Sequence, residues 1–199
     1  MKADERFYPK DLKIDFDSHK RHYERYFKSL EIMGQLGNGE TWLDCACGSG
    51  YGTSLLSNFT SKIYGYDISK QAIEGATSLY GCKNITFTEK LEEIEQSSID
   101  RVFSIETIEH MPESDATNYL LTLKKLMKPA AKMVITTPIV EKTCRSPKNI
   151  FHYIEYCHKD FIILLTQAGF SVKLTKFIST VFTDGETKDQ GYYLCEVNK

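Results

Sequence analysis

The sequence lacks the features by which membrane-spanning and secreted proteins are recognised. None of the apolar runs among its 199 residues approaches the roughly 20 residues that a membrane-spanning helix needs. The first residues, Met1 to Arg6, are mostly charged and form no apolar signal segment. We therefore expect a cytoplasmic protein that has no contact with a membrane.

Cysteine pairs with the spacing of a zinc site are also missing. The cysteines stand at positions 45, 47, 82, 144, 157 and 195, and they include no Cys-x-x-Cys pair. In a chain without a secretion signal, this spacing favours reduced thiols over a disulfide framework. We expect neither a cysteine zinc site nor a structural disulfide.

An excess of charge of one sign is missing as well. The net charge is −2, so the chain as a whole offers no electrostatic attraction to nucleic acid. A local basic face would still be compatible with nucleic acid binding. The charge balance therefore favours a small molecule as the partner.

What the sequence does contain is an alternation of apolar runs and amphipathic segments. The composition, 41% hydrophobic and 26% charged, is that of a globular protein large enough to bury a core. Apolar residues at helical spacing predict helices over residues 18–33, 51–58, 69–79, 116–128 and 159–169. The apolar runs between them predict strands over 41–45, 62–66, 84–88, 100–105 and 132–137. Two closing runs, 170–180 and 191–198, predict a hairpin across a turn at 183–188.

Strands that alternate with helices predict a doubly wound α/β fold. We expect a mostly parallel seven-stranded sheet with a C-terminal antiparallel hairpin, in a single domain over residues 1–199. Residues 1–37 would form an N-terminal arm and a lid helix, and the polar loop 139–150 would contact the substrate. In such sheets the ligand binds beyond the carboxyl ends of the strands, where the strand order reverses.

A glycine-rich stretch follows the first predicted strand. Gly48, Gly50 and Gly52 stand at alternate positions, and Asp44 precedes them at the end of the apolar run. Such a run predicts a strand that turns sharply into a helix, with bare backbone N–H groups facing a ligand. The glycines alone do not identify that ligand.

Two acids narrow the choice of ligand. Asp67, about 20 residues past the glycines, follows the second predicted strand and suits the two hydroxyls of a ribose. Enzymes that use NAD and enzymes that use S-adenosylmethionine (SAM) both place an acid there. Asp44 separates the two classes, because a carboxylate inside the turn is unfavourable beside a pyrophosphate but suits a ligand with an amino group and a sulfonium.

The stretch 43–52 resembles the first motif of class I SAM-dependent methyltransferases, and 66–69 resembles their second motif. The similarity continues through residues 100–110, 123–129 and 134–138. One departure is the pair Ala130-Ala131, where such methyltransferases usually carry two glycines. The resemblance implies a Rossmann-like fold, SAM as the cofactor and methyl transfer as the reaction.

The resemblance also implies roles for individual residues. The glycine turn would contact the methionine part of SAM, the acid after the second strand its ribose, and the end of the third strand its adenine. Arg25, on the N-terminal helix, would help to hold the methionine carboxylate. The residues expected to bind SAM are Tyr26, Asp44, Gly48, Gly50, Asp67, Ile68 and Glu89.

A second set of polar residues follows the fourth predicted strand. Glu106, Glu109 and His110 have the spacing i, i+3 and i+4, which places them on one face if they begin a helical turn. Two carboxylates and an imidazole at this edge of a sheet can bind a divalent cation such as Mg²⁺ or Mn²⁺. His152 would join them if the loop before it folds back over the site.

Three groups of methyltransferases resemble this part of the chain. Ubiquinone-pathway O-methyltransferases, of the methyltransferase domain 11 type, and small-RNA 3′-terminal 2′-O-methyltransferases carry a motif similar to 106–110, and the RNA enzymes add a later histidine. In both groups the motif implies a metal that binds two adjacent oxygens. Methyltransferases of sugar and polysaccharide biosynthesis resemble the chain most broadly, through residues 5–7, 22–26, 106–110 and 151–156.

These resemblances favour methyl transfer from SAM to a hydroxyl of a small molecule, in particular a sugar or a nucleotide-linked sugar. Two routes to an activated hydroxyl stay open. Either His110 takes its proton, or a metal lowers its pKa at a vicinal diol. That metal would be held by Glu106, Glu109 and His110, with His152 as a fourth candidate ligand.

The acceptor is less clearly indicated than the donor. Arg145 and Lys148, in the predicted substrate loop, favour an anionic acceptor. One alternative is an RNA 3′-terminal 2′-O-methyltransferase, and another is a SAM-binding subunit without catalytic activity. An oxidoreductase that uses a dinucleotide is the least favoured interpretation.

Overall fold

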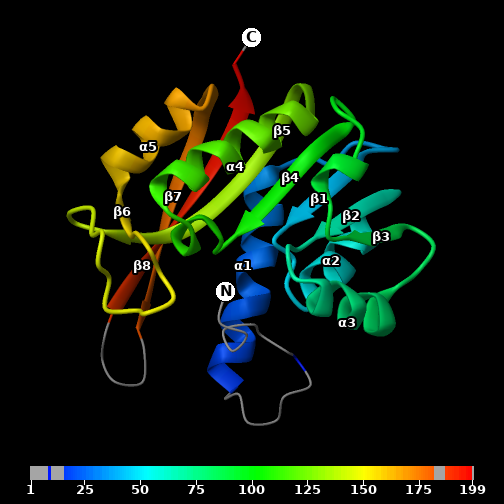
Figure 1. Cartoon of the computed structure of the whole chain (residues 1–199), viewed down its shortest axis with the longest axis horizontal. Helices are drawn as coiled ribbons and strands as arrows, with labels where there is room; N and C mark the ends of the chain where they lie inside the picture. The colour runs from blue at the N-terminus through cyan, green and yellow to red at the C-terminus, as the bar shows by residue number, and fades with distance from the viewer. Residues whose placement is uncertain (1–8, 10–15, 182–186, 199) are drawn as a thin grey trace.

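Figure 1 shows the computed structural model, which describes residue 9 and residues 16–181 and 187–198. The helices are α1 (Phe16–Met33), α2 (Tyr51–Leu56), α3 (Lys70–Tyr80), α4 (Glu113–Leu126) and α5 (His158–Gln167). The strands are β1 (Thr41–Cys45), β2 (Lys62–Tyr66), β3 (Ile85–Thr88), β4 (Ile99–Ile105), β5 (Met127–Val140), β6 (Tyr156–Cys157), β7 (Phe170–Val181) and β8 (Thr187–Val197). Short 3₁₀ turns are η1 (Ser57–Phe59), η2 (Leu91–Glu93) and η3 (Ile108–His110).

The strands form one sheet in the order β3-β2-β1-β4-β5-β8-β7, and the short β6 pairs with the end of β5. Strands β1 to β5 run parallel, whereas β8 lies antiparallel between β5 and β7. The strand order reverses between β1 and β4, which is where ligands bind in doubly wound sheets. The expected parallel sheet with a C-terminal antiparallel hairpin is confirmed.

Alternate side chains of the central strands build an apolar core on each face of the sheet. Leu43 and Val102 pack on the side of α4 and α5. Their neighbours Trp42 and Phe103 pack on the opposite side, with α1 and α2. Figure 1 shows this layering, with α4 and α5 in front of the sheet and α1 behind it.

Local signals place several helix ends where the sequence predicts them. The Ser69 hydroxyl accepts a hydrogen bond from the backbone N–H of Ala72 and so caps the start of α3. Gly169, with a φ of 88°, follows α5, and its N–H bonds the carbonyl of Thr166. Pro112 precedes α4, where its missing N–H costs no helical hydrogen bond.

Strand β5 departs from the prediction at both ends. It begins at Met127 and continues through Pro138 to Val140, so Pro138 does not stop it. Pro138 is tolerated because it lies between the last β4 pairing, at Thr136, and the first β6 pairing, at Ile139, where no parallel strand requires its N–H. The predicted substrate loop therefore begins at 141 rather than 139.

Ala130 stands in the left-handed region, with a φ of 63°. This is the position where similar methyltransferases carry glycine, and an alanine there costs about 1 kcal/mol or more.

Some predicted features lie outside the described residues. They are most of the N-terminal arm and most of the turn at 183–188, although β8 begins at Thr187, four residues earlier than predicted. That residues 1–199 form a single domain stays a prediction. None of the helices in the described ranges combines the length and apolar character that crossing a membrane requires.

Candidate active site

The glycine turn connects β1 to α2 at the carboxyl edge of the sheet. The N–H of Cys47 bonds the carbonyl of Tyr66, at 2.7 Å, which ties the turn to the end of β2. Gly48 has a φ of 55°, and a Cβ placed there would meet no atom within 4 Å. The turn therefore presents bare backbone to open space, as a binding site for a ligand requires.

Asp44 is fully buried under this turn. It accepts hydrogen bonds from the hydroxyls of Thr53, at 2.6 Å, and Tyr26, at 3.2 Å. Burial raises the pKa of Asp44 to about 7, although both hydroxyls oppose the shift. Tyr26 reaches Asp44 because its ring packs on Gly52, where any Cβ would lie only 2.0 Å from the ring. Asp44 and Tyr26 are therefore hydrogen-bonded to each other. Their contacts with SAM stay predictions.

Asp67 follows β2 and joins the turn from the other side. One of its carboxylate oxygens accepts from the N–H of Gly48, at 3.0 Å, and the other from the N–H of Ser69, at 2.9 Å. Ile68 beside it is 69% exposed, and Glu89 follows β3 half-buried. These two bonds hold the Asp67 carboxylate beside the glycine turn, and its contact with a ribose stays a prediction.

Glu106 does not share a helical face with Glu109 and His110, which corrects the prediction. It lies before η3 with a φ of 52°, in the left-handed region, because the chain leaves β4 there in a sharp bend. Its carboxylate accepts from the Thr136 hydroxyl, at 2.9 Å, and pairs with the Arg25 guanidinium, at 3.5 Å. Such backbone strain is concentrated at functional sites.

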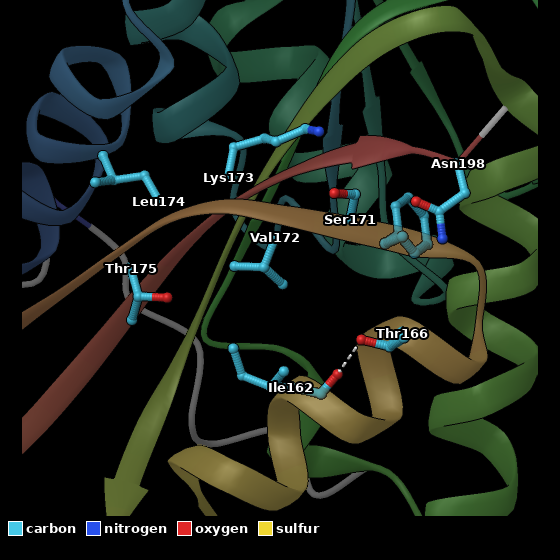
Figure 2. A pocket seen from close by; sticks show the side chains of 9 residues that line it. Ile162, Thr166, Ser171, Val172, Lys173, Leu174, Thr175 and Asn198 are labelled. Atoms are coloured by element: carbon cyan, nitrogen blue, oxygen red, sulfur yellow. Dashed lines mark hydrogen bonds between the residues drawn. The ribbon is translucent and has the colours of Figure 1, made fainter.

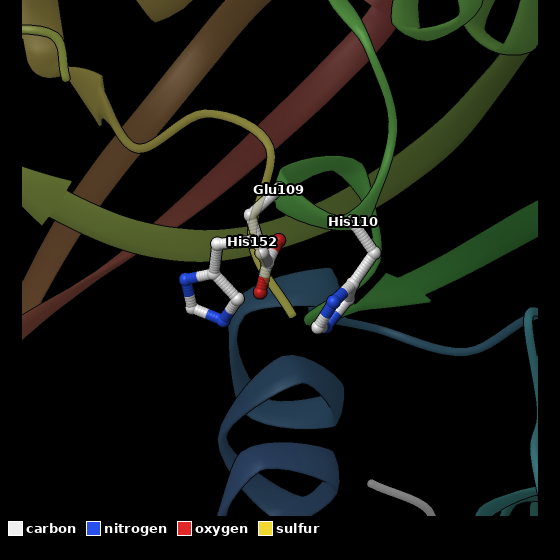
Figure 3. Close-up of side chains that lie close together, drawn as sticks. All are labelled: Glu109, His110 and His152. Atoms are coloured by element: carbon white, nitrogen blue, oxygen red, sulfur yellow. The ribbon is translucent and has the colours of Figure 1, made fainter. Parts of the chain in front are cut away.

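Glu109, His110 and His152 do come together. One ligand atom from each lies within 4.8 Å of the other two. Figure 3 shows the Glu109 carboxylate between the two histidine rings. Glu109 is 1% exposed, and its Oε2 accepts from the Thr137 hydroxyl at 3.1 Å. Its Oε1 has no hydrogen-bond partner among the described residues, although it is buried. A buried carboxylate oxygen without a partner is costly, so this atom is suited to a ligand.

Other groups hold the two histidine rings. Nδ1 of His110 lies 3.1 Å from the carbonyl of Phe151, and Nδ1 of His152 lies 2.7 Å from the carboxylate of Glu155. Burial, followed by the nearby Glu106 carboxylate, raises the pKa of Glu109 well above its usual range. Two imidazoles oriented through Nδ1 and one buried carboxylate match the usual surroundings of a protein-bound transition metal. The residues present therefore fit a divalent cation.

Arg25 extends the site towards β8, and its predicted contact with the methionine carboxylate stays a prediction. Its Nε donates to Oε1 of Gln190, at 3.2 Å, and the Tyr192 hydroxyl donates to the same oxygen, at 3.3 Å. Two donors on Oε1 fix the orientation of the Gln190 amide. Its Nε2 is buried and has no partner in the described part of the chain.

The loop after β5 contributes one of its two predicted cations to an ion pair. Arg145 pairs with Glu113 at 3.1 Å, at the start of α4, and both side chains are exposed. Lys148 is exposed in the same loop. The expectation of an anionic acceptor therefore rests on Lys148.

Several residues of the site are not among those predicted from the sequence. Thr136 and Thr137 are buried polar residues that follow the apolar run 133–135 of β5, so their polarity there is a signal that could have been used. Glu155 stands three residues after His152, which is also detectable. Gln190 has no such signal, because only the folded hairpin brings it beside Arg25.

A separate cavity of about 390 Å³ opens between α5 and β7. Figure 2 shows the side chains that line it, among them Ile162, Val172 and Thr175. None of its lining residues belongs to the candidate site at the carboxyl edge. The carboxyl edge, in contrast, combines open backbone, buried acids and histidines.

Comparison with known proteins points to one family. A family model described as a methyltransferase domain matches residues 36–194. An O-methyltransferase from Penicillium expansum, cnsE, is 28% identical over 163 residues, which cover 75% of this chain and 58% of that protein. A probable SAM-dependent methyltransferase from Mycolicibacterium smegmatis is 26% identical over 141 residues, with coverage of 69% and 54%. The chain thus spans little more than half the length of these relatives.

A solved structure supports the fold. It is the 1,6-didemethyltoxoflavin-N1-methyltransferase of Burkholderia thailandensis with bound S-adenosylhomocysteine. The TM-score is 0.71 at 14% identity, and the match covers 92% of this chain and 83% of that one. At this identity the likeness concerns the fold alone.

Proposed function

Because the chain belongs to the methyltransferase-domain family, we propose that it methylates a hydroxyl group of a small-molecule acceptor with SAM as the donor. The family match spans most of the chain, and a relative named as an O-methyltransferase supports oxygen as the atom that is methylated. A sugar or a nucleotide-linked sugar is the proposed acceptor class. It offers adjacent hydroxyls to the polar groups after β4 and β5.

The proposed donor site is the glycine turn with Asp67. SAM supplies a methyl group activated by a positively charged sulfonium. The backbone at Gly48 and Gly50 and the side chains of Asp44 and Tyr26 form the methionine end. Asp67 takes the ribose hydroxyls, while Ile68 and Glu89 border the adenine. The open backbone at Gly48 and the position of Asp67, which is hydrogen-bonded to the same turn, support this assignment.

The proposed acceptor site lies around Glu109. A hydroxyl is a weak nucleophile while it is protonated, so the site must either accept the proton of the hydroxyl or lower the pKa of the hydroxyl. Glu109, His110 and His152 would hold a divalent cation, and a bound cation lowers the pKa of a coordinated hydroxyl. Two imidazoles favour Mn²⁺ over Mg²⁺ among the two expected ions. Glu106, held by Arg25 and Thr136, shapes the rim of this site. In the metal-free alternative, His110 is the general base.

Acceptor recognition is assigned to Gln190. Its Nε2 is a buried donor that faces no acceptor among the described residues, and Arg25 fixes its orientation. We infer that it donates to an oxygen next to the hydroxyl that is methylated. An oxygen-rich acceptor satisfies this donor, whereas a hydrocarbon leaves it unpaired.

The single observation that carries the proposal is the cluster of Glu109, His110 and His152, in which the buried Oε1 of Glu109 has no hydrogen-bond partner among the described residues. The test measures S-adenosylhomocysteine release with UDP-glucose, methyl α-D-glucopyranoside and 3,4-dihydroxybenzoate as acceptors. Each assay is run with EDTA and then with added Mn²⁺. We expect turnover that EDTA abolishes and Mn²⁺ restores. Full activity in EDTA would exclude the metal route. SAM binding by calorimetry without turnover on any acceptor would favour the non-catalytic alternative.

A second candidate function is methylation of the 2′-hydroxyl at an RNA 3′ end. The observation that favours it is the position of His152, the later histidine of the RNA-like motif, beside Glu109 and His110. The test is transfer of a radiolabelled methyl group to a short RNA. An RNA with a terminal 2′,3′-diol should react and the matched 3′-deoxy RNA should not. Absence of label in both would remove this candidate.

A further inference from the structure

The segment 149–155 is attached to the candidate metal site by backbone hydrogen bonds. The N–H groups of Tyr153 and Ile154 donate to the carbonyl of Glu109, at 2.7 and 3.3 Å. Cys144 and Glu155 exchange two backbone bonds, at 2.8 and 2.9 Å, which close the base of the loop. The position of this segment is thus fixed relative to the three candidate ligands.

The hydrogen bonds of this segment determine which nitrogen of each histidine carries the proton. A backbone carbonyl only accepts, so His110, 3.1 Å from the carbonyl of Phe151, carries its proton on Nδ1. A carboxylate also accepts, so His152 donates from Nδ1 to Glu155 at 2.7 Å. In this tautomer the lone pair of each neutral ring is on Nε2.

That lone pair of His152 faces an amide. The N–H of Phe151 donates to Oδ1 of Asn149, at 3.0 Å, which fixes the orientation of the Asn149 side chain. Nδ2 of Asn149 then lies 2.9 Å from Nε2 of His152. An amide nitrogen only donates, so Nε2 accepts this hydrogen bond with its single lone pair.

We propose that Asn149 is a removable cap on the ligand nitrogen of His152, and that Glu155 is the positioning residue that keeps this nitrogen unprotonated. The proposal rests on the metal site of the proposed function. A metal ion and the Asn149 amide compete for the same lone pair, so metal binding displaces the amide. The cap therefore lowers metal affinity and links metal loading to the conformation of the turn 149–152.

The first test needs no metal and no acceptor. Nitrogen-15 NMR of the imidazole rings, on the EDTA-treated protein at pH 7.5, distinguishes the two neutral tautomers. We expect the Nδ1–H tautomer for both His110 and His152, and a shift towards Nε2–H for His152 in Glu155→Gln. An Nε2–H tautomer at His152 in the unaltered protein overturns the proposal.

The second test measures Co²⁺ affinity by calorimetry and by visible absorption. Loss of one neutral hydrogen bond should make Asn149→Ala bind Co²⁺ about 3- to 10-fold more tightly. Asn149→Asp keeps an acceptor for Phe151 and replaces the capping amide with a carboxylate, so it should bind more tightly still. Glu155→Gln should bind about 10- to 100-fold more weakly, as expected for a residue that orients a ligand. The matched control is Lys142→Ala, at an exposed position of the same loop, which should bind as the unaltered protein does.

SAM binding, measured in the same samples, separates this proposal from the proposed function. Unchanged or weaker Co²⁺ binding in both Asn149 variants, with normal SAM binding, overturns the cap. Absence of Co²⁺ binding in every sample, with normal SAM binding, overturns the cap and the metal site but leaves methyl transfer standing. Absence of SAM binding to the unaltered protein overturns the proposed function. In that case the histidine tautomers and the Co²⁺ affinities still decide the role of Asn149.

Discussion

The two halves of the candidate site satisfy their polar groups in different ways. The donor half, residues 44–53 and 67–69, pairs its two acids with its own hydroxyls and backbone, apart from Tyr26. The acceptor half, residues 106–110 and 149–155 with Arg25 and Gln190, draws on segments far apart in the chain. It contains two of the buried polar atoms that lack a partner in the described ranges.

The polar groups of the donor half have their hydrogen-bond partners, whereas the acceptor half contains buried polar atoms that a ligand could satisfy. Asp67 has both oxygens hydrogen-bonded, so binding a ribose adds contacts without relieving any deficit. Glu109 and Gln190 each keep a buried atom that is unpaired within the described residues, and a bound metal or acceptor would remove its cost. The acceptor half should therefore gain more from its ligand than the donor half.

The largest expected effect is on the acceptor half. Replacing Glu109 by Gln removes the proposed charged ligand, and we expect methyl transfer to fall on the order of 10²- to 10³-fold. SAM affinity should stay within about twofold, because the Glu109 carboxylate bonds Thr137 rather than a residue of the donor half. Steady-state kinetics and calorimetry measure the two effects. Glu95→Gln, on an exposed side chain, is the control, and an equal loss of SAM affinity would break the separation of the halves.

The donor half should show the reverse pattern. Asp67→Ala removes the acceptor of two backbone N–H groups and the proposed ribose contact, so SAM affinity should fall about 100-fold. Co²⁺ affinity at Glu109 should not change. Calorimetry with SAM and with Co²⁺ on the same variant is the measurement, with the exposed Asp115→Ala as control. Normal SAM binding in Asp67→Ala would contradict the assignment of the donor half.

Asp44 makes the donor half sensitive to pH. Its folded pKa of about 7 lies above the value of 3.8 expected in the unfolded chain, so the folded protein holds a proton that the unfolded chain releases. Stability should therefore fall between about pH 4 and pH 7, by about 1.4 kcal/mol per unit, and level off above pH 7. Asp44→Asn lacks this proton. The unfolding free energy of the variant, relative to that of the unaltered protein, should therefore be about 2 to 3 kcal/mol higher at pH 8 than at pH 5. Parallel curves in urea titrations would refute the raised pKa.

The smallest effect sharpens the comparison within the acceptor half. Gln190→Leu removes the buried donor, and we expect KM for an active acceptor to rise about 10-fold while kcat changes little. SAM affinity should not change. The control is the exposed Gln96→Leu. A lower kcat with an unchanged KM would mean that Gln190 supports the reaction rather than acceptor binding.

The donor half was largely predictable from the sequence, because its signals are local. The strand 41–45, the strand 62–66 and the cap at Ser69 follow from apolar runs and from a hydroxyl at a helix start. The glycine spacing and Asp67 are likewise adjacent to the elements that position them.

The acceptor half was predictable only as a set of residues. The motif 106–110 and His152 are visible in the sequence, but the left-handed bend at Glu106 is not, and it removes Glu106 from the face that Glu109 occupies. Asn149 and Gln190 enter the site through hydrogen bonds that only the folded chain determines. Tertiary packing, rather than periodicity, sets these positions.

Two neighbouring residues of α1 contact different halves of the site. Tyr26 bonds Asp44 in the donor half, while Arg25 contacts Glu106 and Gln190 in the acceptor half. A tilt of the helix that loosens one contact disturbs the other, so under the proposed function α1 would link the binding of SAM to that of the acceptor. Linkage is reciprocal: whatever factor SAM adds to the affinity for the acceptor, the acceptor adds to the affinity for SAM.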